Sequence, residues 1–137
     1  MNTKTAFLFP GQGSQSVGMV AEMAEAYPVV RQTFEEASGV LGYDLWEVVE
    51  NDPAETLGRT EVTQPALLAA GIATWRAWKS LQGADPDFVA GHSLGEYTAL
   101  VAADALAFGD AISLVAQRGR LMQQATPAGT GAMAAIL

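Results

Sequence analysis

The sequence has no cysteine and only one histidine, His92, among its 137 residues. The absence of cysteine excludes disulfide bonds, a thiol nucleophile and a zinc site built on cysteine. The single histidine excludes a metal site that needs several imidazole ligands. We therefore expect a protein without a bound metal.

Basic residues and long apolar runs are also scarce. Seven Lys and Arg stand against fifteen Asp and Glu, which gives a net charge of −8, and the basic residues form no cluster. Nucleic-acid binding needs a basic face, so it is excluded, and the surface is a poor match for an acidic partner. No run approaches the roughly eighteen apolar residues of a membrane span, and the apolar stretch before Pro10 is too short for a signal peptide. We expect a cytoplasmic protein with no membrane partner.

Half of the sequence is hydrophobic, which is enough for one domain with a core. Its pattern predicts, in order, a strand at 5–9, helices at 19–27, 29–41 and 45–50, a long helix at 65–81, a strand at 88–90, helices at 96–105 and 110–124, and a strand at 131–137. Strands that alternate with helices in this way are typical of an α/β fold with a mostly parallel sheet.

Two helices have more detailed predictions. Asp44 is a candidate N-cap for the short helix at 45–50, and Pro65 is expected at the first position of the long helix. Near-helical spacing along the long helix predicts deep burial for Leu67, Leu68, Gly71, Ile72, Trp75 and Trp78.

Residues 91–95 (GHSLG) place a serine between two glycines where a strand meets a helix. This is the G-x-S-x-G pattern of a nucleophile elbow, in which Ser93 is raised on a sharp, strained turn. Small residues are required two positions either side of the serine, because a Cβ atom there would collide with the neighbouring strand or helix. The alternative is a glycine-rich loop with an ordinary serine.

A serine nucleophile needs an oxyanion hole. The backbone N–H of Leu94, which follows the nucleophile, is one candidate donor, and a second usually comes from a glycine-rich loop after another strand. The loop at 11–13 (GQG) has this character, and Gln12 is the candidate donor. Ser16 stands where a dinucleotide-binding motif needs glycine. The alternative is a loop whose glycines serve only turn geometry.

Arg118 is the candidate for selecting the acyl group. Leu114, Val115, Leu121 and Met122 lie three or four residues from it, so the spacing places Arg118 on the apolar stripe of its helix. An inward-facing arginine needs a carboxylate partner, and its planar fork suits a substrate carboxylate. A structural ion pair with an acidic side chain is the alternative.

The general base is harder to assign. His92 adjoins Ser93, but a tight elbow that raises the serine directs its neighbour elsewhere, so we expect His92 to support the site or contact substrate. A Ser–Asp dyad could use Asp104 or Asp110, although the Asp-Gly-Gly or Asp-Gly-Ala signature of that class is absent.

Four motifs together resemble the malonyl-CoA:acyl carrier protein transacylase family of bacterial type II fatty acid synthesis. They are FPGQGSQ at 9–15, TQPA at 63–66, GHSLGEY at 91–97 and QRG at 117–119. The resemblance implies that malonyl passes from CoA to Ser93 and then to the phosphopantetheine thiol of acyl carrier protein, with no cofactor. It also implies the other roles: oxyanion hole for Gln12 and Leu94, the malonyl carboxylate for Arg118, and substrate binding for Gln64 and His92.

The family also implies a hydrolase-like three-layer large subdomain, here 1–128 and incomplete, and a ferredoxin-like small subdomain. Residues 129–137 resemble the first strand of the latter. The family's catalytic histidine has no counterpart here, so we expect the general base to be absent. We expect the chain, an N-terminal portion of a longer enzyme, to be inactive or severely impaired by itself. The alternatives are a serine acyl hydrolase or thioesterase, and a non-catalytic fragment.

Overall fold

The computed structural model describes residues 3–127 and 129–131. Its elements are β1 (Ala6–Phe9), α1 (Ala21–Ala26), α2 (Pro28–Leu41), α3 (Leu45–Glu50), α4 (Thr60–Ser80), β2 (Phe88–Gly91), α5 (Leu94–Ala102) and α6 (Phe108–Ala125). The predicted order is confirmed up to α6. The strand predicted at 131–137 lies outside the described residues except for Gly131, which belongs to no helix or strand.

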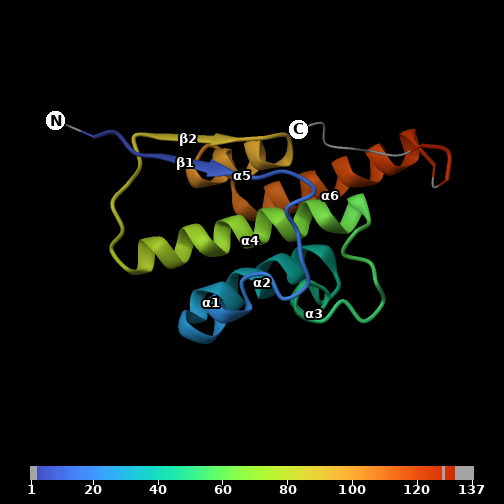
Figure 1. Cartoon of the computed structure of the whole chain (residues 1–137), viewed down its shortest axis with the longest axis horizontal. Coiled ribbons are helices and arrows are strands. Elements are labelled where there is room, and N and C mark those ends of the chain that lie inside the picture. Colours follow the sequence, from blue (N-terminus) through green and yellow to red (C-terminus); the bar gives the residue numbers. More distant parts are fainter. Residues whose placement is uncertain (1–2, 128, 132–137) are drawn as a thin grey trace.

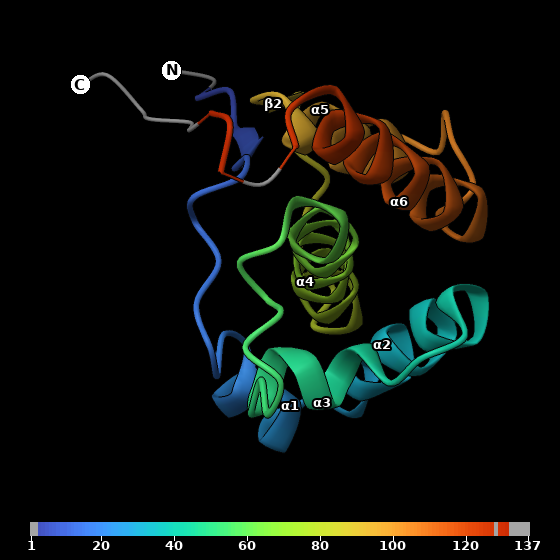
Figure 2. The same cartoon turned by 90° about the vertical axis from the view of Figure 1, so that its right-hand side faces the viewer.

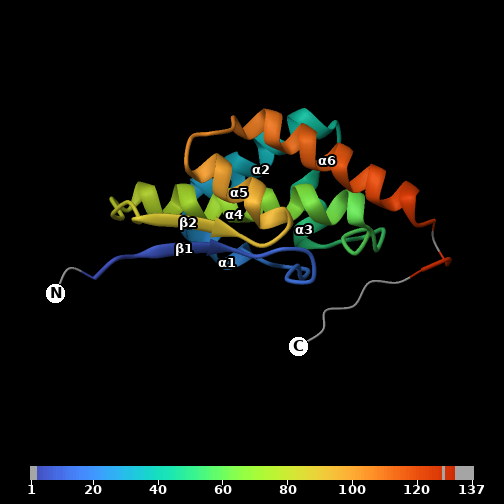
Figure 3. The same ribbon diagram turned by 90° about the horizontal axis from the view of Figure 1, so that it is seen from above.

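The two strands form a parallel pair in which Ala6 faces Phe88 and Phe9 faces Gly91. They run side by side (Figure 3), and α4 lies along one side of the pair (Figure 1). This arrangement confirms the α/β class with parallel strands. Because the strands are parallel, the loop after β1 and the turn after β2 leave the sheet at the same edge.

Helix α4 is the centre of the molecule. It runs between α5 and α6 on one side and α1, α2 and α3 on the other (Figure 2). Small and aliphatic side chains of α4, among them Leu68 and Ile72, are almost completely buried. A helix that is covered on several sides has no wide polar face. The other helices therefore pack against α4 from both sides.

The start of α4 differs from the prediction. The helix begins at Thr60, so Pro65 lies inside it and not at its first position. The extra turn forms because the Thr63 side chain and backbone N–H both donate to the Arg59 carbonyl, at 3.0 Å and 2.8 Å. Pro65 has no backbone N–H, so it donates no α-helical hydrogen bond to the Glu61 carbonyl.

The predicted cap of α3 is confirmed. The Glu47 backbone N–H donates to the Asp44 carboxylate at 3.0 Å. Helix α5 starts two residues and ends three residues earlier than predicted. Helix α6 starts two residues earlier and ends one residue later than predicted.

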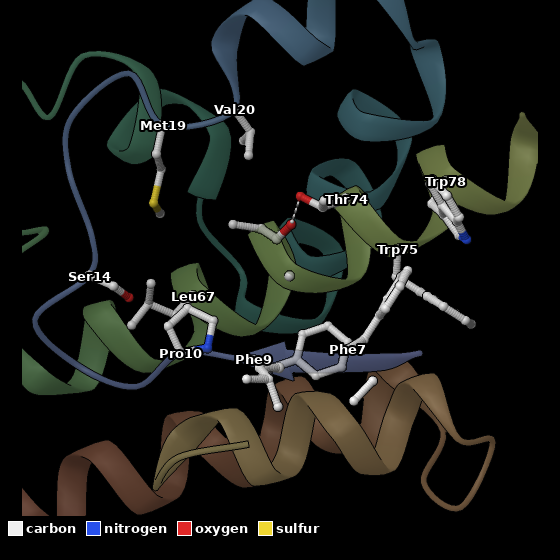
Figure 4. Close-up of a pocket in the computed structure, with 14 residues that line it drawn as sticks. Phe7, Phe9, Pro10, Ser14, Met19, Val20, Leu67, Thr74, Trp75 and Trp78 are labelled. Carbon is white, nitrogen blue, oxygen red and sulfur yellow. Dashed lines mark hydrogen bonds between the residues drawn. The ribbon is translucent and has the colours of Figure 1, made fainter. Parts of the chain in front are cut away.

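The predicted burial of the tryptophans on α4 is wrong for Trp78, which is 41% exposed, and Trp75 is only partly buried. Both rings pack edge-on against Phe7 of β1, with centroids 5.6 Å apart. They line an apolar hollow of about 550 Å³ beside β1 (Figure 4). The apolar stripe of α4 therefore extends to Trp75 and Trp78, as predicted, but at this C-terminal end of the helix it faces an open hollow.

No helix in the described ranges, 3–127 and 129–131, is long and apolar enough to cross a membrane.

The turn between β2 and α5 has no space for side chains at its two glycines. A Cβ atom on Gly91 would lie 1.9 Å from the Gly95 carbonyl carbon, and one on Gly95 would lie 2.0 Å from the Phe9 carbonyl oxygen. Both obstacles are backbone, which cannot move aside without displacing a strand or helix. The turn and the β1–β2 pair are thus one packed unit.

We predict that Gly95→Ala lowers the free energy of unfolding by about 2 kcal/mol or more, because the added methyl group overpacks backbone. Gly39→Ala is the matched control. Gly39 is an exposed glycine of α2 with open space around its Cα, so alanine there should be neutral or slightly stabilising. Urea unfolding followed by circular dichroism measures both. Equal midpoints for the two variants would show that the elbow tolerates a side chain.

Candidate active site

Ser93 occupies the turn between β2 and α5 with φ 53° and ψ −110°. A non-glycine residue in this region is strained, and such strain is typical of functional turns. Ser93 is exposed, and its hydroxyl caps no backbone N–H of α5 within the part of the chain that the structure describes. The hydroxyl thus points to the site and not into its own helix, as the elbow pattern predicts.

The loop after β1 lies against this elbow. The His92 backbone N–H donates to the Phe9 carbonyl at 3.1 Å, which continues the strand pairing. A Cβ atom on Gly11 would lie 2.7 Å from the His92 carbonyl oxygen, so the loop approaches the elbow as closely as a glycine allows. Gln12 is therefore placed beside the turn that carries Ser93.

The two candidate oxyanion donors meet at this edge. Leu94 is the first residue of α5, where backbone N–H groups have no partner inside the helix. The Gln12 side chain is anchored, since its Nε2 donates to the Thr60 hydroxyl at 3.1 Å. Its Oε1 is buried with no hydrogen-bond donor among the described residues. The anchored side chain fixes the backbone of the Gln12 loop.

Arg118 reaches Ser93 from α6. Its Nη2 donates to the Ser93 Oγ at 3.1 Å, and its Nη1 donates to the Gln64 Oε1 at 2.9 Å. Gln64 belongs to α4 and is fully buried, and its Nε2 donates to the Met122 sulfur at 3.0 Å. The structure thus joins Ser93, Arg118 and Gln64, which come from three separate elements.

The helical stripe predicted for Arg118 is only partly right. The buried face of α6 consists of Phe108, Ala111, Ile112, Val115, Ala116 and Gly119. Leu114 and Leu121 are 43% and 57% exposed, so Arg118 is partly buried at the border of this face and not at its centre. Within 3–127 and 129–131 it forms no ion pair with an acidic side chain. The described residues therefore do not supply the structural ion pair considered as the alternative.

Gly119 explains how Arg118 and Gln64 come together. A Cβ atom on Gly119 would lie 2.7 Å from the Glu61 Cα and 2.8 Å from the Thr60 carbonyl oxygen. This contact presses α6 against the first turn of α4, one turn before Gln64. The close approach at Gly119 thus sets the separation of α6 and α4, across which Arg118 donates to Gln64.

The other predicted candidates lie further from the reacting hydroxyl. His92 is exposed, and its ring lies beside Gly11, while the hydrogen bond to the Ser93 hydroxyl comes from Arg118. Asp104 follows the end of α5 that is opposite Ser93, and Asp110 is in the first turn of α6. Both carboxylates are therefore at the wrong ends of their helices for a Ser–Asp dyad.

Two contacts of the site were not predicted from the sequence. The guanidinium carbon of Arg118 lies 5.5 Å from the centre of the Tyr97 ring, within cation–π range. Tyr97 follows Ser93 by one helical turn, and this spacing could have identified it. The Met122 sulfur that accepts from Gln64 has no comparable pattern in the sequence.

The arrangement fits acyl transfer involving an acyl group with a free carboxylate. It combines a strained serine, backbone N–H groups at a helix start and a cation within hydrogen-bond distance of the serine. A hollow of about 500 Å³ lies beside it, lined by Gln12, Thr60, Met122, Gln123, Ala125, Thr126 and Gly131. The residues that the structure describes contain no cluster of three or more potential metal ligands.

Comparisons with known proteins agree with this chemistry. The malonyl CoA-acyl carrier protein transacylases of Salmonella typhimurium and Bacillus subtilis are 58% and 52% identical to the chain over 135 residues. Those residues are 98% of this chain but only 44% and 42% of the two relatives, so the chain spans less than half of their length.

Solved structures show the same likeness. An acyl carrier protein S-malonyltransferase from Vibrio cholerae superimposes with a TM-score of 0.89 at 61% identity, over 93% of this chain and 42% of that one. A malonyl-transacylase in complex with a type II PKS acyl-carrier protein gives 0.88 at 58% identity, over 91% and 40%. The family described as the acyl transferase domain matches residues 6–137. The chain therefore belongs to the acyl transferase domain family.

Proposed function

We propose that this chain supplies the nucleophile, oxyanion hole and carboxylate clamp of a malonyl-CoA:acyl carrier protein transacylase in fatty acid biosynthesis. The observation that carries the proposal is the 3.1 Å hydrogen bond from the Arg118 guanidinium to the Ser93 hydroxyl. A fixed cation beside a nucleophile suits an acyl group that ends in a carboxylate. The names of the relatives support malonyl-CoA and acyl carrier protein as the two partners.

In the first half-reaction, the Ser93 Oγ attacks the thioester carbonyl carbon of malonyl-CoA. The carbon–sulfur bond breaks, CoA leaves as the thiol with the proton from the serine, and a malonyl-serine ester remains. The backbone N–H groups of Leu94 and Gln12 stabilise the negative charge on the carbonyl oxygen. Arg118 binds the free malonyl carboxylate, and Gln64 and His92 line the substrate site.

In the second half-reaction, the phosphopantetheine thiol of the carrier protein attacks the ester, and Ser93 regains its proton. No metal or organic cofactor enters this scheme. We assign the general base to no residue of this chain, because the one histidine adjoins the nucleophile and both candidate aspartates lie at the wrong helix ends. The cytoplasmic location expected from the sequence is part of the same proposal.

Incubation with malonyl-CoA is expected to add a single malonyl group to the wild-type chain. Ser93→Ala is expected to abolish this adduct, because it removes the hydroxyl of the proposed nucleophile. Intact-mass spectrometry measures the adduct. Ser113→Ala removes an exposed serine of α6 and should leave the adduct unchanged. An adduct of equal yield in Ser93→Ala would overturn the assignment of the nucleophile.

The fate of the adduct separates transfer from hydrolysis. Added holo-acyl carrier protein is expected to take up malonyl from the serine, slowly, because removal of a general base costs orders of magnitude in rate. Release of free malonate at the same rate with and without carrier protein would instead indicate an acyl hydrolase. Absence of any wild-type adduct would indicate a non-catalytic chain.

We predict that Arg118→Ala lowers the preference for malonyl-CoA over acetyl-CoA by about tenfold to a hundredfold, because a hydrogen-bonded ion pair of about 1.5–3 kcal/mol is lost. Arg120→Ala is the matched control, since Arg120 is exposed two residues further along the same helix. The measurement is the ratio of initial acylation rates with the two thioesters. Equal ratios in wild type and Arg118→Ala would contradict a carboxylate clamp.

A further inference from the structure

We propose that Tyr97 is the positioning residue of the carboxylate clamp: its ring holds the Arg118 guanidinium over Ser93 when the substrate carboxylate is bound. The inference rests on the proposed function for its substrate. It concerns a contact to which the four sequence motifs assign no role.

Three contacts hold Arg118 in the free protein. Two are hydrogen bonds, to Ser93 and Gln64, and the third is the Tyr97 ring, 5.5 Å from the guanidinium carbon. Tyr97 is in α5, four residues after Ser93, so the two side chains lie on the same face of the helix start. The ring is partly buried and packs against the hydrophobic core, which fixes its position.

The three contacts respond differently to substrate. The guanidinium has five N–H donors, and a carboxylate that approaches it from the side of Ser93 competes for the Nη2 donor that now serves the Ser93 Oγ. The ring interacts with the cation through its face and uses no N–H donor. The Tyr97 contact therefore persists when the hydrogen bond to Ser93 is exchanged for one to the acyl group.

Acylation weakens the hydrogen bond to Ser93. Once Ser93 carries an ester, its oxygen is part of the acyl group and is a poorer acceptor for Arg118, so the arginine is free to follow the carboxylate. An arginine side chain free to rotate loses conformational entropy when it is fixed in this way. The ring restricts the side chain before substrate arrives, which lowers that cost.

The aromatic ring and not the hydroxyl makes the contact, because the Tyr97 hydroxyl forms no hydrogen bond with any side chain or backbone group in residues 3–127 or 129–131. Phenylalanine at this position should therefore preserve the function, and an aliphatic side chain of similar size should not. These two substitutions distinguish positioning by the ring from general packing.

The first test measures the ratio of acylation rates with malonyl-CoA and acetyl-CoA. Tyr97→Leu is expected to lower the malonyl preference about threefold to tenfold, and Tyr97→Phe to stay within about twofold of wild type. Tyr27→Leu, which alters a partly buried tyrosine next to α1, is the matched control and should leave the ratio unchanged. Equal losses with both thioesters in Tyr97→Leu would overturn the proposal, since that is the effect of damaged packing.

The second test does not depend on enzymatic activity, so it gives a result even if malonyl-CoA forms no adduct with the chain. The chain has five arginines, and the Nε–Hε signal of Arg118 is identified by NMR as the one that disappears in Arg118→Lys. We expect this signal to be shifted by the ring in wild type and in Tyr97→Phe, and to move to the position of a solvated arginine in Tyr97→Leu. A signal that does not respond to Tyr97→Leu would overturn the positioning role, whereas a missing wild-type adduct alone would overturn only the proposed function. If Tyr97→Leu does not fold, Tyr97→Met supplies the same comparison.

Discussion

The lack of space around two backbone positions is the constraint on which this structure depends. Gly91 lies against Gly95, and Gly95 lies against the Phe9 carbonyl, at separations that exclude even one methyl group. These contacts fix the end of β2, the start of α5 and the end of β1 relative to one another. The strained serine and the loop that carries Gln12 are consequently positioned by backbone packing.

The pairing of Arg118 with Gln64 is assembled differently, through contacts between residues far apart in the sequence. Arg118 and Gln64 are 54 residues apart, and they meet because Gly119 lets α6 approach the first turn of α4. Gln64 is fully buried, so its amide must be paired. The pairing with Arg118 and Met122 satisfies it and also orients its oxygen toward the arginine. The hydrogen bonds that satisfy the buried Gln64 amide therefore also fix the geometry of the site.

The features that were predictable from sequence are those determined within a few residues. The elbow and the Asp44 cap depend on local backbone geometry, and both are confirmed. Burial depends on what lies opposite a helix, which spacing alone does not reveal. Trp78 is therefore more exposed than its stripe predicts, and Leu114 and Leu121 share the nominal stripe of Arg118 yet face outward.

The hydrogen bond between Arg118 and Ser93 has a consequence for the resting protein. An oxygen lone pair that accepts from a cation is less available for attack than a free one. In the free protein the Arg118 guanidinium occupies one acceptor position of the Ser93 oxygen. The guanidinium proposed to bind the acyl carboxylate is thus also a hydrogen-bond donor to the proposed nucleophile while the site is empty.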